Sequence, residues 1–63
     1  MSLTDNVVRL RIADGHSVDQ VAASTRLPAS LIQAIENGRV QVPPKVVRAL
    51  AQHFRVSEAE LLG

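Results

Sequence analysis

The sequence contains no cysteine, and its only aromatic residue is Phe54. Without cysteine, the chain can form neither a disulfide nor a thiolate metal site. Hydrophobic residues still make up 46% of the chain, which is enough for a helical core. Because large aromatic side chains are almost missing, that core must be built from aliphatic residues.

Long hydrophobic runs and a strong charge are also missing. No run approaches the roughly 20 residues of a membrane-spanning helix, and no signal-peptide pattern opens the chain. We therefore expect a cytoplasmic protein without membrane contacts. The net charge is only +1, so charge permits a nucleic-acid partner without identifying one.

The chain has 63 residues and shows no repeat, low-complexity tract or linker. A chain of this length forms one domain, so we expect a single domain over residues 1–63. It is either a complete small protein or one domain separated from an effector or partner domain.

The residues that carry metal or catalytic chemistry are few and scattered. His16 and His53 stand apart, with no cysteine or clustered carboxylate beside them, so we expect no metal and no cofactor. His16, Ser17 and Asp19 are close in sequence, but a catalytic triad needs groups that converge in space and an oxyanion hole. A helix cap explains Ser17 sufficiently, so we expect no catalytic residue and no enzyme.

The segment 17–38 is read as two short helices joined by a tight turn. Ser17 and Gln20 form the capping-box pattern that begins a helix. Pro28 suits the first position of the second helix, and Asn37-Gly38 supplies a left-handed stop. Both helices have apolar faces at helical spacing, formed by Val18, Val21, Ala22 and Thr25 in the first and by Leu31, Ile32 and Ile35 in the second.

Three further helices are predicted around this pair. The first covers about residues 4–13, with Thr4 and Asp5 as cap and first-turn residues and Gly15 as its stop. Another starts at the prolines 43 and 44, which close the preceding loop, and a short last one starts with a second capping box at 57–60. The result is an all-α fold whose shared core is predicted to contain Val7, Leu10, Val21, Ala22, Ile32, Ile35, Val47, Leu50, Ala51 and Phe54.

The segment 17–38 resembles the helix-turn-helix of the lambda repressor and Cro-like (XRE-type) family. The matching residues are Ser17, Gln20, Val21-Ala22, Leu27, Ile32 and the string 35–38, Ile-Glu-Asn-Gly. The resemblance implies a compact five-helix domain with its helix-turn-helix at about 17–37. It also implies a sequence-specific DNA-binding transcriptional regulator, in general a repressor, which binds double-stranded DNA as a homodimer. The helix at about 28–37 would enter the major groove.

The resemblance assigns roles to individual residues. Arg11 and Glu36 would form a partly buried ion pair. The alternative is that each charge is solvated separately at the surface. Base-reading positions would fall on Ala29, Ser30, Gln33 and Ala34, with Leu31 able to contact thymine methyl groups. Phosphate contacts would come from Arg26, Arg39 and Lys45 and from the start of the preceding helix. The full DNA-binding set is Ser17, Val18, Arg26, Ala29, Ser30, Leu31, Gln33, Ala34, Asn37, Arg39 and Lys45.

The sequence departs from the family pattern at two positions of the turn. Arg26 replaces a frequent glycine, at a cost of roughly 1–2 kcal/mol if its backbone is left-handed. Pro28 replaces the usual serine or threonine cap, so one cap hydrogen bond is lost. Both departures indicate a relaxed turn within the same fold.

Two interpretations stay open at this point. A dimer would be joined by Val56, Leu61 and Leu62, although the two leucines could equally complete the core. The fold could also serve as a protein-contact module with weak or no DNA binding, through the apolar residues Ala29, Leu31, Ala34, Val40 and Val42. The operator sequence and the choice between repression and activation are not encoded in any visible pattern.

Overall fold

The computed structural model describes residues 2–63, and within that range it has five α-helices and no strand. This confirms the predicted all-α, five-helix architecture. The helices are α1 (Leu3–Ala13), α2 (Val18–Thr25), α3 (Ala29–Glu36), α4 (Pro44–Phe54) and α5 (Glu58–Leu62).

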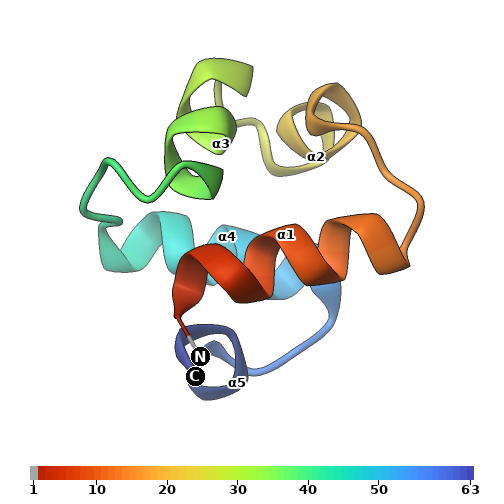
Figure 1. Ribbon diagram of the computed structural model, residues 1–63. Coiled ribbons are helices and arrows are strands. Elements are labelled where there is room, and N and C mark those ends of the chain that lie inside the picture. Colours follow the sequence, from red (N-terminus) through yellow and green to blue (C-terminus); the bar gives the residue numbers. More distant parts are fainter. Residues whose placement is uncertain (1) are drawn as a thin grey trace.

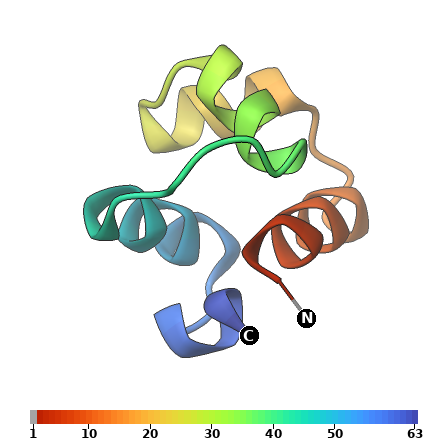
Figure 2. The same cartoon turned by 60° about the vertical axis from the view of Figure 1, so that its left-hand side comes forward.

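The helix-turn-helix, α2 and α3, forms a layer on top of α1 and α4 (Figure 1). The view turned by 60° shows the same order, with α5 on the opposite side from α2 and α3 and close to the chain's beginning (Figure 2). Each helix is too short to be stable alone in water. The layers therefore depend on the apolar faces that they bury between them.

The core lies where these layers meet. Nine of the ten residues predicted for it are buried, and Leu10 packs against it half-buried. The buried hydrophobic set also contains Leu61, which is fully enclosed. The buried residues are Val7, Val21, Ala22, Ile32, Ile35, Val47, Leu50, Ala51, Phe54 and Leu61.

Two predicted helix starts and one predicted capping box need correction. α1 begins at Leu3, and its cap is Ser2, whose hydroxyl accepts from the Asp5 amide, so Thr4 lies inside the helix, whereas Asp5 is in the first turn as predicted. Pro28 is the residue before α3 and not its first residue. At α5, the Ser57 hydroxyl accepts from the Glu60 amide, but the Glu60 side chain contacts that hydroxyl instead of returning to the Ser57 backbone.

Several helices end at a residue in the left-handed backbone conformation, which is a glycine at some ends and an arginine at others. Gly38 has φ +69°, and the amides of Gly38 and Arg39 donate to the carbonyls of Ile35 and Ala34, the pattern of a Schellman motif. Arg26 and Arg55 adopt the same left-handed geometry, with φ of 61° and 60°. The left-handed conformation considered for Arg26 is therefore present, with its steric cost.

Among residues 2–63, no helix is long and apolar enough to cross a membrane.

Candidate nucleic-acid interface

One face of α3 is exposed and polar without charge. Ser30, Gln33 and Asn37 are exposed, and Ala34 beside them is half-buried. Their spacing of three, four and seven residues places them on one side of the helix. These groups offer hydroxyl and amide donors and acceptors, which are the chemistry that reads base edges.

The negative charge of α3 is turned away from this face. Glu36 is the only acidic residue of the helix, and Arg11 donates to both of its carboxylate oxygens, Nε to Oε2 at 2.6 Å and Nη2 to Oε1 at 2.9 Å. The two side chains are 18% and 13% exposed. Hydrogen bonding to Glu36 raises the pKa of Arg11 above its ordinary value, so the guanidinium stays charged at any physiological pH. The pair that the resemblance implies is thus formed, and it neutralises α3.

A second contact fixes the same end of α3. The Thr4 hydroxyl donates to the Ile35 carbonyl at 2.8 Å, which thereby gains a second donor beside the Gly38 amide. Arg11 also donates to the His16 carbonyl at 2.9 Å. Two hydrogen bonds from Arg11 to Glu36 and one from Thr4 to Ile35 therefore join α1 to α3 and set the position of α3.

Cationic side chains lie at both ends of α3. Arg26 is exposed in the turn before it, and Arg39 is exposed directly after its Schellman stop. Lys45 is exposed in the first turn of α4. Arg48 is different, because its Nε lies 3.8 Å from an oxygen of Glu58 in an exposed pair. The positive charge closest in sequence to α3 is therefore carried by Arg26 and Arg39.

The first turn of α2 has a side-chain cap for its backbone amides, and the first turn of α3 has none. Ser17 is exposed, and it is occupied in a complete capping box with Gln20. Pro28 gives α3 no side-chain cap. The amides of the first turn of α3 therefore have no side-chain acceptor within the described residues, and such donors can bind phosphate oxygens.

Several predicted site residues are only half-exposed. Val18, Ala29 and Leu31 pack partly against the core, so their side chains contribute less to an outer surface than their spacing alone indicates. The same holds for Val42, and Ala34 is also half-buried. Of the five apolar residues proposed for a protein contact, only Val40 is exposed, at 38%.

The proposed dimer interface needs a correction at Leu61. Its side chain is fully buried within the single chain, because α5 packs on α1 and the Asn6 amide donates to the Leu61 carbonyl at 2.8 Å. Leu61 therefore completes the core and is not available to a second copy. Leu62 is 52% exposed, and Val56 is half-buried against the core.

Two positioning residues were missed by sequence reasoning. Asn6 is buried and also donates to the Glu60 carbonyl at 3.3 Å, so its side-chain amide closes the end of α5. A signal for it was present, because Asn6 falls three residues after Leu3 and four before Leu10, on the apolar face. Thr4 carried no such signal, since its acceptor is a backbone carbonyl 31 residues away.

The fold and this surface define the class of helix-turn-helix proteins. The family model described as a helix-turn-helix domain matches residues 5–62, and the chain belongs to that family, which is of the XRE/Cro-like type. Membership places it, in general terms, among DNA-binding regulators, a group that is typically not enzymatic. Comparison with curated proteins and with solved structures gave no significant match.

Proposed function

We propose that this chain is a sequence-specific DNA-binding transcriptional regulator, acting as a repressor, that inserts α3 into the major groove. The observation that carries the proposal is the charge arrangement of α3. Its outer face is polar and uncharged, its one carboxylate is neutralised by Arg11, and exposed arginines lie before and after it. A groove-facing helix needs this combination, because an unpaired carboxylate would be repelled by the phosphates on either side.

The contacts divide into phosphate binding and base reading. Arg26, Arg39 and Lys45 supply phosphate contacts, together with Ser17 and the uncapped amides of α3. Ser30, Gln33 and Asn37 supply hydrogen bonds to bases, and Ala29, Leu31, Ala34 and Val18 supply small apolar contacts. Because α3 carries no arginine or lysine, few bidentate base contacts can form. Much of the specificity is then expected to come from DNA shape.

The proposed regulator acts as a homodimer. One domain of this size covers only a few base pairs, so two copies about 34 Å apart on one face of the DNA are needed for useful specificity. With Leu61 in the core, Leu62 and the exposed edge of Val56 are the apolar groups left on this side of the chain to join them. The proposal extends to a cytoplasmic location and to a single helix-turn-helix domain over residues 1–63, without a cofactor.

The test is a DNA-binding titration with matched variants, on a duplex selected from random sequence. Arg39→Ala should weaken binding almost equally on all sequences and reduce the slope of affinity against salt by about one ion. Arg55→Ala removes the same charge from the far end of α4 and should leave both unchanged. Binding to a palindromic duplex should reach two chains per duplex.

Base reading is tested in the same titration. Gln33→Ala should relax the preference at one or two base pairs, by about 1–3 kcal/mol for each base that the glutamine reads, whereas Gln52→Ala on α4 should not. If Arg39→Ala and Gln33→Ala both leave affinity and preference unchanged, α3 does not face DNA and the assignment is wrong.

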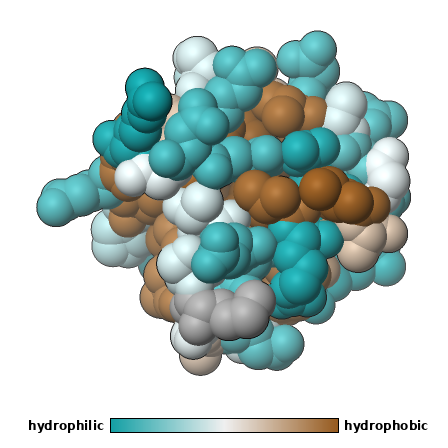
Figure 3. All heavy atoms as spheres, viewed as in Figure 1, coloured by the Kyte–Doolittle hydropathy of each residue, from teal (hydrophilic) through white to brown (hydrophobic). Residues whose placement is uncertain are grey.

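One observation favours a protein partner as a second candidate function. On the face that carries α1, hydrophobic side chains form a strip between hydrophilic ones (Figure 3). Ile12 on this helix is 63% exposed, and exposed apolar strips often mark interaction surfaces. The exposed Ile12 supports a protein contact on α1, away from α3. A loss of partner binding in Ile12→Ser with DNA affinity intact would assign the two surfaces separately.

A further inference from the structure

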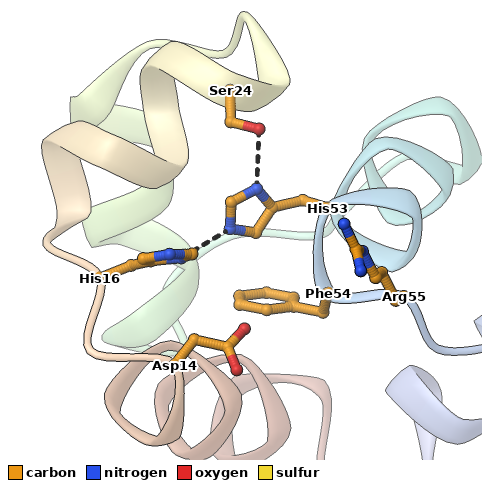
Figure 4. Close-up of a pocket in the computed structure, with 6 residues that line it drawn as sticks. All are labelled: Asp14, His16, Ser24, His53, Phe54 and Arg55. Atoms are coloured by element: carbon orange, nitrogen blue, oxygen red, sulfur yellow. Dashed lines mark hydrogen bonds between the residues drawn. The ribbon is translucent and has the colours of Figure 1, made fainter.

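Two histidines that are far apart in sequence meet at the edge of the helix-turn-helix. His16, in the loop before α2, places its Nδ1 3.2 Å from Nε2 of His53 on α4. The other ring nitrogen of His53 lies 2.8 Å from the Ser24 hydroxyl on α2. Figure 4 shows the His53 ring between the side chains of Ser24 and His16, with one contact to each. The chain of contacts therefore joins α2 and its leading loop to α4.

The nitrogen–nitrogen contact exists only in certain protonation states. A hydrogen bond between two imidazole nitrogens requires one N–H and one bare nitrogen. If both rings are protonated, both nitrogens carry hydrogen, the bond is lost, and two positive charges face each other at short range. The contact is therefore compatible with neutral rings or with one shared charge, and incompatible with two.

The surroundings of the pair resist the second proton. The rings border a surface pocket of about 410 Å³ lined by Asp14, His16, Ser24, His53, Phe54 and Arg55. Burial lowers the pKa of His53 below its ordinary value, the charge of His16 lowers it further, and Asp14 opposes both effects. The charged groups around the pair are Asp14 and Arg55 in the pocket and Arg11 at the His16 carbonyl.

A metal site is a poorer interpretation of the same residues. Stable metal sites in proteins generally use three or four ligating side chains. Among residues 2–63, no group of three histidine, cysteine or acidic side chains is placed to hold an ion. The pair is instead arranged as a hydrogen-bonded contact between two elements.

We propose that His16 and His53 form a proton-sensitive clasp, which holds α2 against α4 near neutral pH and releases it in mildly acidic solution. Since α2 supports α3, release loosens the helix-turn-helix and lowers DNA affinity as the pH falls. The last step rests on the proposed function, whereas the clasp itself does not.

The direction of the effect on stability follows from linkage. A histidine whose pKa is lower in the folded state than in the unfolded chain binds fewer protons when folded. Stability therefore rises with pH in that window. The contribution of His53 is present above its unfolded pKa of about 6.5 and is lost as the pH falls through the lower folded value.

The direct test is an NMR titration, because the chain has only two histidines and their ring signals are easily assigned. The His53 ring should titrate below the ordinary histidine value. In His16→Gln its pKa should rise, because the neighbouring charge is gone. A histidine introduced by Gln41→His, in the exposed α3–α4 loop, serves as the unperturbed control. If His53 titrates like this control and is unaffected by His16→Gln, there is no clasp.

Thermal unfolding gives a second readout that needs no DNA. The wild-type melting temperature should fall between about pH 7.5 and pH 5.5 by roughly 4–8 °C more than that of His53→Gln. Equal falls in the two proteins would overturn the proposal. Ser24→Ala keeps both rings and should retain the His53 response to His16→Gln, which tests the pair even if a histidine variant unfolds.

The DNA-binding step is tested separately. Affinity for the selected duplex should fall at least about threefold more in wild type than in His53→Gln over the same pH range. A clasp seen by NMR in a chain that binds no DNA at neutral pH would contradict the proposed function and leave the clasp standing. DNA binding with identical pH dependence in both proteins would overturn the regulatory step.

Discussion

The two helices of the helix-turn-helix are attached to the rest of the molecule by different chemistry. α3 is held on α1 by the bidentate pair of Arg11 and Glu36. α2 is held on α4 by the contacts of His53 with His16 and Ser24. The first junction is an ion pair whose guanidinium stays charged across physiological pH. The second depends on rings that change charge close to neutrality.

The difference indicates which part of the motif is rigid. The ion pair is mostly shielded from water and has a partner for each charge, so it fixes the angle at which α3 leaves the core. The histidine contacts are partly exposed, and the contact between the two rings is lost when both rings carry a proton. We therefore expect the Glu36 end of α3 to stay attached to α1 under conditions in which α2 and the turn that leads into α3 begin to loosen.

Breaking the α3 junction should have the largest effect. Arg11→Met leaves the Glu36 carboxylate largely buried without its partner, at a cost of about 2–4 kcal/mol in the free energy of unfolding. The double variant Arg11→Met/Glu36→Leu should recover much of that loss. Urea unfolding near pH 7 measures all three.

The matched control for this cycle is Arg48→Met. Its pair with Glu58 is longer, at 3.8 Å, and its two side chains are 64% and 48% exposed, so its loss should cost about 1 kcal/mol or less. If the effects of the Arg11 and Glu36 substitutions are simply additive, the pair contributes no coupling and α3 is held by packing alone.

Breaking the α2 junction at Ser24 should have the smallest effect. Ser24→Ala removes one exposed hydrogen bond to His53 and should cost about 0.5–1 kcal/mol near neutral pH. Ser30→Ala, also on an exposed helix position, corrects for the helix preference of alanine. Unfolding in urea compares the two. A cost that equals that of Arg11→Met would show that the junctions do not differ in strength.

Most of the fold was predictable because helical spacing identifies inward-facing residues. It predicted five helices, and it identified nine buried core positions together with Leu10 at the core's edge. Helical spacing could not show which of Leu61 and Leu62 is buried. Two adjacent residues on a short helix do not both face the core, and the spacing is compatible with either one. Only the packing of α5 on α1 makes Leu61 the buried one.

The contacts that position the candidate site were less predictable. The Arg11–Glu36 pair was expected only through family resemblance, since 25 residues separate its members. His16 and His53 were expected to be isolated, because they are 37 positions apart in the sequence. Periodicity shows which face of a helix a residue lies on, but it does not show which residue of another element lies beside it. Thr4 contacts a backbone carbonyl, which no side-chain pattern reveals.

The central claim is that α3 and the residues at its two ends face DNA. The most direct measurement is the change in backbone amide NMR signals when the selected duplex is added. The largest changes should fall at Ser17, in the turn at Arg26, along residues 29–37 and at Arg39, with α1 nearly unchanged. Changes confined to α1 around Ile12, or a spectrum that does not respond to the duplex, would contradict the claim.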